Sequence, residues 1–316
     1  MASDGATYDS NETGSWLVCT ACGTQFPTSD REKTKTCFIC DDPRQFTPQT
    51  GQAFTTLNEI RSRAKNTWTP FKGDSRFISI VTEPKVGIGQ RAILIKTPKG
   101  NVLWDCITLL DEETIAKIRG LGGLKAIVIS HPHYYTTHVE WAKAFDCPVY
   151  LAKEDKEWTT QSSAHQVFVE DTELDIKIDG EPSGVKALKL GGHFPGSFVA
   201  LYDEHLLIAD TLVSTPSGLG SWDTDAVGVA RTRPKGMNSY SFMWSIPNMI
   251  PLRPSELERM WGILKKYDFS STHGAFLGAD IVKTVPEMKQ RVLESMQIQI
   301  RYMGYDEHAF LNETVG

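Results

Sequence analysis

Four segments of the chain carry histidine or aspartate where a strand is expected to run into a loop. The first contains His131 and His133, the second His193, the third Asp210 and the fourth His273. Two histidines spaced two apart in an extended loop project to the same side, so both imidazoles can reach one ion. This pair therefore predicts a metal site, and the later segments are candidate contributors to it.

Four cysteines form a second pattern typical of metal ligands. Cys19 and Cys22 make one C-x-x-C pair, Cys37 and Cys40 make another, and 14 residues separate the pairs. Two such turns bring four thiolates to the tetrahedral geometry that Zn²⁺ prefers, and Gly23 permits the left-handed turn that this requires. A closed Cys₄ zinc site has no open coordination position, so we expect a structural zinc. The segment also resembles rubredoxin, in which the same class of spacing holds one iron for electron transfer.

The composition of the chain indicates a folded globular protein and argues against some classes of partner. Its 316 residues suffice for one large domain and a small appendage, and 40% of them are hydrophobic. The net charge of −6, without long runs of Lys and Arg, argues against nucleic acid as a partner. The sequence begins without a signal-peptide pattern, and no apolar stretch approaches the roughly 18 residues of a membrane span. We therefore expect no membrane association and a cytoplasmic location, which also suits the paired cysteines.

Four ranges divide the chain by composition. Residues 1–15 are polar and without periodicity, which predicts a disordered tail. Residues 16–46 hold the cysteine pairs but too few apolar side chains to fold unaided, so they form a zinc ribbon stabilised by its metal. Residues 47–75 are interpreted as a linker with a short helix near 57–63, and residues 76–316 as the main domain.

Short strands and helices alternate twice along the main domain. This order predicts an α/β fold in which two sheets pack face to face with helices outside. The expected strands are 77–81, 92–96, 102–105, 126–130, 148–151, 185–190, 197–202 and 205–210, and the expected helices are 114–118, 139–145, 255–266 and 285–301.

The order of the motifs is similar to that of the metallo-β-lactamase superfamily. His-x-His is followed by Gly-Gly-His-x-Pro-Gly-Ser, then by a strand that ends in Asp-Thr, and then by a late His-Gly, all within about residues 76–285. The resemblance implies an αββα four-layer sandwich that follows the rubredoxin-like ribbon in the chain. It also implies that His131, His133 and His193 bind the first metal, that Asp210 bridges, and that His273 belongs to a second metal.

The loop after the first histidine pair departs from the superfamily pattern H-x-H-x-D-H. Tyr135 and Thr136 stand where Asp and His would bind the second metal, which leaves only Asp210 and His273 for that site. We therefore expect one catalytic ion, zinc or alternatively iron. Tyr135 is either a hydrogen-bond donor to the reacting oxygen or a packing residue, and His138 is an alternative ligand.

The expected chemistry is hydrolysis. A metal held by imidazoles and a carboxylate lowers the pKa of bound water from about 15.7 to near 7, and the resulting hydroxide can attack a carbonyl while Asp210 orients it. A small cyclic amide or ester, a lactam or lactone, fits this reaction. The stretch 237–251, dense in Met and aromatic residues, predicts a loop over a pocket for an apolar or aromatic substrate.

Two other functions stay open. A mononuclear iron oxygenase or redox enzyme with a rubredoxin-like module is one, because imidazole and carboxylate suit Fe²⁺ as well as Zn²⁺. A non-catalytic binding protein with a degenerate second metal site is the other. The joint retention of four residues argues against it, namely His131, His133, His193 and Asp210. Whether the protein forms a homo-oligomer is also left open.

Overall fold

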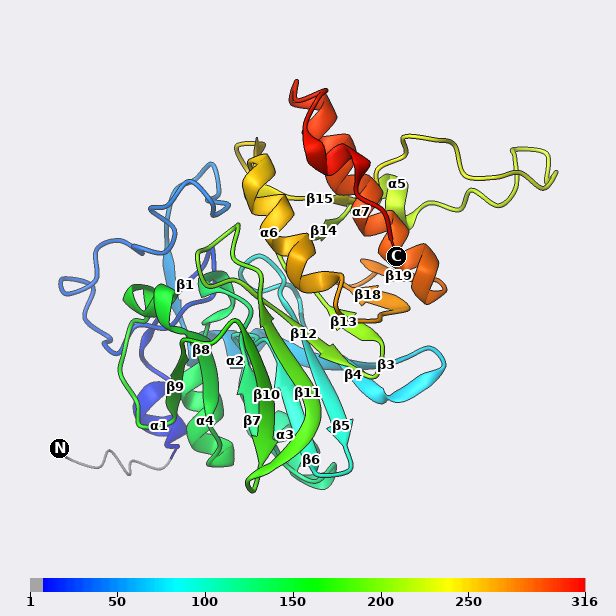
Figure 1. The fold of residues 1–316 in the computed structure, drawn as a ribbon. Helices are drawn as coiled ribbons and strands as arrows, with labels where there is room; N and C mark the ends of the chain where they lie inside the picture. The colour runs from blue at the N-terminus through cyan, green and yellow to red at the C-terminus, as the bar shows by residue number, and fades with distance from the viewer. Residues whose placement is uncertain (1–7, 316) are drawn as a thin grey trace.

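Two large β-sheets form the centre of the fold (Figure 1). The computed structural model describes residues 8–315. The first sheet has the strand order β3-β4-β5-β6-β7-β8-β9, antiparallel from β3 to β6 and parallel from β6 to β9. Its strands are β3 Lys65–Phe71, β4 Asp74–Glu83, β5 Arg91–Thr97, β6 Gly100–Trp104, β7 Ala126–Val128, β8 Val149–Ala152 and β9 Gln166–Val169.

The second sheet comes from the second half of the chain. Its order is β10-β11-β12-β13-β18-β19, and only the β13–β18 pair is parallel among these described strands. The strands are β10 Glu173–Ile178, β11 Glu181–Lys189, β12 Phe198–Tyr202, β13 His205–Leu207, β18 Ser271–His273 and β19 Asp280–Val282. Four short strands lie between β13 and α6 and form two antiparallel pairs, β14 Val213–Ser214 with β15 Tyr240–Ser241 and β16 Met243–Ser245 with β17 Ile250–Pro251.

Seven α-helices are seen in residues 8–315. Several begin at side-chain caps: Thr56 and Glu59 form a capping box at α2, and Asp111 accepts a hydrogen bond from the Thr114 amide at α3. Among these helices none has the length and apolar character needed to cross a membrane. The helices are α1 Ser10–Thr13, α2 Leu57–Arg63, α3 Glu112–Gly120, α4 His138–Phe145, α5 Pro216–Leu219, α6 Pro254–Leu264 and α7 Val285–Tyr302.

Three buried clusters separate four layers. Side chains alternate between the two faces of a strand, so Ile127 of β7 packs toward α3 and α4, whereas Val128 packs toward the second sheet. On the far side of the second sheet, Leu206 of β13 packs with Trp261 of α6 and Val292 of α7. The layers are therefore helix, sheet, sheet and helix. This arrangement confirms the predicted αββα sandwich.

The N-terminal part of the chain is more ordered than its composition predicts. Residues 1–7 lie outside the described residues, but α1 forms in the range predicted to be disordered, capped by Asp9. Thr13 of α1 donates a hydrogen bond of 2.7 Å to the buried Glu140 of α4. This buried contact with the main domain explains why a polar segment is ordered.

The ranges predicted for the ribbon and the linker also differ from the structure. Strand β1 Leu17–Cys19 pairs with β2 Phe54–Thr56, which joins the cysteine segment to residues beyond 46. Strand β3, in the predicted linker, pairs with β4 along its length, so the first sheet begins at Lys65. We use the name Cys₄ module below for residues 16–56.

Candidate metal centre

Three histidines and one aspartate meet at one end of the sandwich. His131 and His133 follow β7 of the first sheet, whereas His193 and Asp210 follow β11 and β13 of the second. A hydrogen bond of 2.8 Å from the Phe198 amide to the Ser130 carbonyl joins the two sheets there. Since every one of these loops leaves the carboxyl end of a strand, the αββα packing brings the four side chains together. We call these four residues the His₃Asp group.

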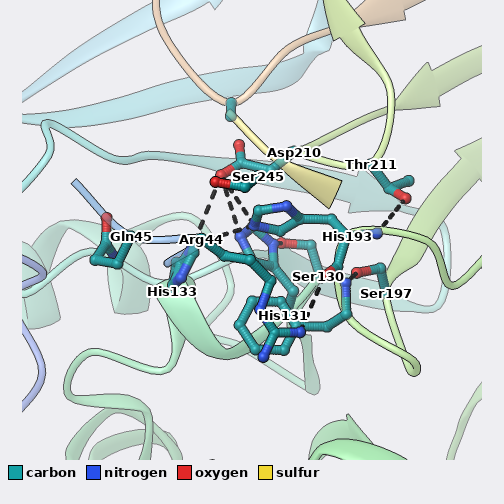
Figure 2. Close-up of polar contacts among 12 residues, drawn as sticks. Arg44, Gln45, Ser130, His131, His133, His193, Ser197, Asp210, Thr211 and Ser245 are labelled. Carbon is teal, nitrogen blue, oxygen red and sulfur yellow. Dashed lines mark hydrogen bonds and ion pairs between the residues drawn. The ribbon is translucent and has the colours of Figure 1, made fainter. Parts of the chain in front are cut away.

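The donor atoms of the His₃Asp group are spaced for one ion (Figure 2). Asp210 Oδ2 lies 3.4 Å from His131 Nε2, 3.7 Å from His133 Nδ1 and 3.8 Å from His193 Nε2. The last two nitrogens are 3.4 Å apart. A tetrahedral Zn²⁺ with bonds of about 2.0–2.1 Å needs its donors roughly 3.3 Å apart. The four donors therefore fit a metal ion.

The hydrogen bonds of His131 support this fit. Its Nδ1 is 2.8 Å from Ser130 Oγ, which in turn donates to Asp105 Oδ2 at 3.0 Å. Its Nε2 is buried and has no hydrogen-bond partner among residues 8–315. Leaving such a group unsatisfied costs about 1–3 kcal/mol. A metal ion at this position would satisfy it, and the Ser130 and Asp105 side chains fix the ring for that purpose.

The protonation states of His133, His193 and Asp210 also suit a metal. Burial lowers the pKa of His133 to about 4 and holds that of His193 well below its usual value. Burial by itself would raise the pKa of Asp210, but the neighbouring imidazoles, His131 first, hold it well below its usual range. Neutral imidazoles and an ionised carboxylate are the forms that bind metal.

The four cysteines form a second metal-ligand group. All four are buried, and the Sγ atoms of Cys19 and Cys40 lie 3.6 Å apart, those of Cys22 and Cys37 3.7 Å apart. Tetrahedral Zn–S bonds of about 2.3 Å place sulfurs roughly 3.8 Å apart. Gly23 has φ +79°, as its place after the second cysteine predicts. This cluster fits a zinc ribbon.

His273 does not join the His₃Asp group, contrary to the prediction that it serves a second metal. Its Nε2 lies 3.0 Å from His205 Nδ1, and its Nδ1 lies 3.2 Å from Asp280 Oδ1. The reason is strand alternation, because His273 lies in β18 with its side chain away from the site. The next residues, Gly274 and Ala275, line the cavity beside Asp210 instead.

Tyr135 also lies outside the group. Its side chain is buried, and its hydroxyl donates to the Asp155 carbonyl oxygen at 3.4 Å rather than toward the metal site. The alternative ligand His138 is likewise engaged elsewhere, since its Nδ1 donates to the Tyr135 carbonyl at 2.7 Å. The preceding residue, Tyr134, packs on His131 instead, with ring centroids 5.3 Å apart.

A Tyr135→Phe variant tests this correction. We expect it to keep wild-type metal content and turnover, because the lost hydroxyl makes one long hydrogen bond away from the site. Its free energy of unfolding should fall by no more than about 1 kcal/mol. Elemental analysis, kcat and a urea titration measure these three quantities. Loss of metal or a hundredfold lower kcat would return Tyr135 to the active site.

Sequence reasoning missed the residues that support the ligands. Asp105 accepts hydrogen bonds from both the amide and the hydroxyl of Ser130, at 2.7 and 3.0 Å. Burial raises its pKa well above the usual value. The sequence signal that could have identified Asp105 was its position, because it directly follows β6, the parallel neighbour of β7.

A cavity of about 380 Å³ opens beside Asp210. Its walls are largely apolar, and part of the lining comes from the Cys₄ module. The loop predicted to lie over a pocket, residues 237–251, supplies Ile246 to this cavity. Trp244, Ile250 and Pro251 line a separate cavity of about 700 Å³. The residues that line the smaller cavity are Arg44, Gln45, Phe46, Lys85, Ile88, Ala209, Asp210, Leu212, Val213, Ser214, Ile246, Gly274, Ala275, Phe276 and Ala279.

Comparison with known proteins identifies the family. A family model described as the metallo-β-lactamase superfamily matches residues 87–258. A Bacillus subtilis (strain 168) protein described as "Uncharacterized protein YmaE" is 38% identical over 262 residues, which are 83% of this chain and 88% of that protein. The chain therefore belongs to the metallo-β-lactamase superfamily, which confirms the resemblance drawn from its motifs.

Solved structures of similar fold have low sequence identity to this chain. The DIM-1 metallo-β-lactamase is 10% identical, with a TM-score of 0.47 over 76% of this chain and 98% of that chain. A mutant flavo di-iron protein from Thermotoga maritima is 13% identical, with a TM-score of 0.45 over 74% of this chain. The present chain spans 62% of the length of that flavo di-iron chain.

Proposed function

We propose that this protein is a metal-dependent hydrolase that opens a small cyclic amide or ester, a lactam or a lactone. The observation that carries the proposal is the His₃Asp group, four buried donors spaced for one ion at the edge of a largely apolar cavity. When bound, zinc at this group would supply hydroxide at neutral pH and polarise a carbonyl.

The side chains of the site have distinct roles in this reaction. His131, His133 and His193 would hold the ion. Asp210, ionised and directed at the same point, would orient the attacking water. The chain from His131 through Ser130 to Asp105 keeps the first imidazole in one orientation.

The cavity supports a small apolar or aromatic substrate. Leu212, Val213 and Phe276 form apolar walls next to Asp210, and such walls exclude bulk water from the reacting bond. Its size suits a small molecule. The two C-x-x-C pairs favour metal over disulfides and support a reducing compartment, which we take to be the cytoplasm.

Metal analysis and turnover together test the proposal. We expect about two zinc ions per chain, and hydrolysis of some members of a panel of lactams and lactones. A chelator should abolish the hydrolysis and added Zn²⁺ should restore it. A visible iron spectrum with no hydrolysis of any panel member would refute the hydrolase and favour the redox alternative, because the same donors suit Fe²⁺.

A further inference from the structure

Gln45 belongs to the Cys₄ module, yet it lines the cavity that opens beside Asp210. Figure 2 draws Gln45 together with the residues of the metal centre, and Asp210 lines the same cavity. Gln45 is 5% exposed. The Cys₄ module is therefore part of the wall of the cavity beside Asp210 as well as a zinc ribbon.

Of the two polar atoms in the Gln45 side-chain amide, one makes a hydrogen bond within the described residues and the other makes none. Its Oε1 accepts a hydrogen bond of 2.8 Å from the Phe46 amide, which fixes the orientation of the group. Its Nε2 is buried and has no hydrogen-bond partner within residues 8–315. A buried amide nitrogen without an acceptor is unfavourable, and such groups in native proteins call for a specific explanation. A ligand that presents an acceptor oxygen in the cavity would satisfy it.

Arg44 holds this part of the module against the metal-binding loop. Its guanidinium forms an ion pair with Asp42 at 2.7 Å and donates to the His193 carbonyl at 3.1 Å. It also lies 3.8 Å from the centroid of the Phe194 ring. These contacts tie the backbone next to Gln45 to a loop that carries a ligand of the His₃Asp group.

A second set of hydrogen bonds holds the same segment from the other side. The Pro43 carbonyl accepts from Ser245 Oγ at 2.5 Å and from Asn248 Nδ2 at 2.7 Å. The Gln45 amide donates to the Asp42 carbonyl at 3.1 Å. Gln45 is thus presented by a backbone fixed at several points, as a residue that positions a ligand requires.

We propose that Gln45 is a substrate-binding residue, whose Nε2 donates a hydrogen bond to a carbonyl or carboxylate oxygen of the ligand in the cavity. This inference rests on the proposed function, because it assumes that the cavity is the substrate site. It assigns the Cys₄ module a direct part in that site. The ligand class that it selects is an apolar or aromatic molecule with an acceptor oxygen.

Benzoate is a suitable probe, since it combines an aromatic ring with carboxylate oxygens. Calorimetric titration of the zinc-loaded protein should show binding that is about tenfold to a hundredfold weaker in a Gln45→Met variant, which keeps the side-chain length but removes the donor. A Gln45→Glu variant, which places a negative charge there, should bind benzoate at least as weakly. Metal content should stay at the wild-type value in both variants.

A Gln49→Met variant is the matched control, because this exposed glutamine lies four residues further on and outside the cavity. It should bind benzoate like the wild type. Equal benzoate affinity of the wild type and Gln45→Met, or no measurable binding by the zinc-loaded wild type, would overturn the inference. Failure of the hydrolase proposal is distinguishable, since benzoate would then bind in a Gln45-dependent manner while no lactam or lactone is hydrolysed.

Discussion

A His133→Ala protein is expected to carry one metal ion per chain in place of two and to lose measurable hydrolysis. The reason is that the His₃Asp group offers three imidazoles, and removing one leaves too few strong donors to hold the ion. The Cys₄ ion should remain. Elemental analysis and kcat on the same preparation measure both effects.

His138→Gln is the matched control for that variant. His138 lies five residues further along and is buried as His133 is, but its ring nitrogens contact the Tyr135 carbonyl and Gln166 Nε2 rather than the metal group. It should retain two ions. Full metal content in His133→Ala would refute the one-ion site described above, and loss of an ion in His138→Gln would show that His138 is a ligand.

The order of motifs made most of the fold predictable. Strands such as β7 are short and rich in β-branched residues, and some of them run into loops with distinctive metal-ligand motifs. Because those loops leave the carboxyl ends of strands in two packed sheets, placing the strands also places His131, His133, His193 and Asp210.

The errors came from single-residue geometry that a motif does not contain. His273 belongs to the late His-Gly motif, but the register of β18 with β19 pairs it with Asp280 and turns its ring away from the cavity. In the same way, the turn over Pro132–Tyr134 directs Tyr134 rather than Tyr135 toward His131. One position along a strand or a turn decides which face a side chain occupies.

Contacts between segments that are distant in the chain could not be predicted from the sequence either. Composition divides the Cys₄ module from the main domain and gives no sign of a contact between the two metal sites. The structure contains a direct link instead. Gln90 is buried in the main domain, and its Nε2 donates both to the Cys22 carbonyl at 2.6 Å and to the His133 carbonyl at 3.2 Å.

Two more contacts strengthen that link. The Gln25 amide of the Cys₄ module donates to the Thr136 carbonyl at 3.1 Å, just beyond the first histidine pair. Thr108 Oγ1 donates to the Gly23 carbonyl at 3.0 Å. The backbone that carries Cys22 and the backbone that carries His133 are therefore held by shared hydrogen bonds, so that disorder in one should spread to the other.

We therefore expect a Cys22→Ser protein to lose the Cys₄ ion and also to hold the second ion more weakly. Metal binding supplies much of the folding energy of such a module, about 10 to 16 kcal/mol in isolated zinc fingers, so most of the protein should aggregate. In the soluble fraction, loss of the ordered Cys22 backbone removes one end of the Gln90 bridge. The affinity of the His₃Asp group for zinc should fall by at least tenfold, measured by competition with a chelator.

Cys147→Ser is the control, because Cys147 is a buried cysteine of the main domain that lies outside the Cys₄ cluster. This variant should keep both ions and wild-type zinc affinity, with at most a modest drop in unfolding midpoint. Two results would count against the expectation for Cys22→Ser. Soluble protein with an unchanged unfolding midpoint would contradict a structural role of the Cys₄ ion. A destabilised protein that nevertheless holds its second ion with wild-type affinity would contradict the coupling. The hydrogen bonds of Gln90 would then not link the order of the Cys₄ module to the zinc affinity of the His₃Asp group.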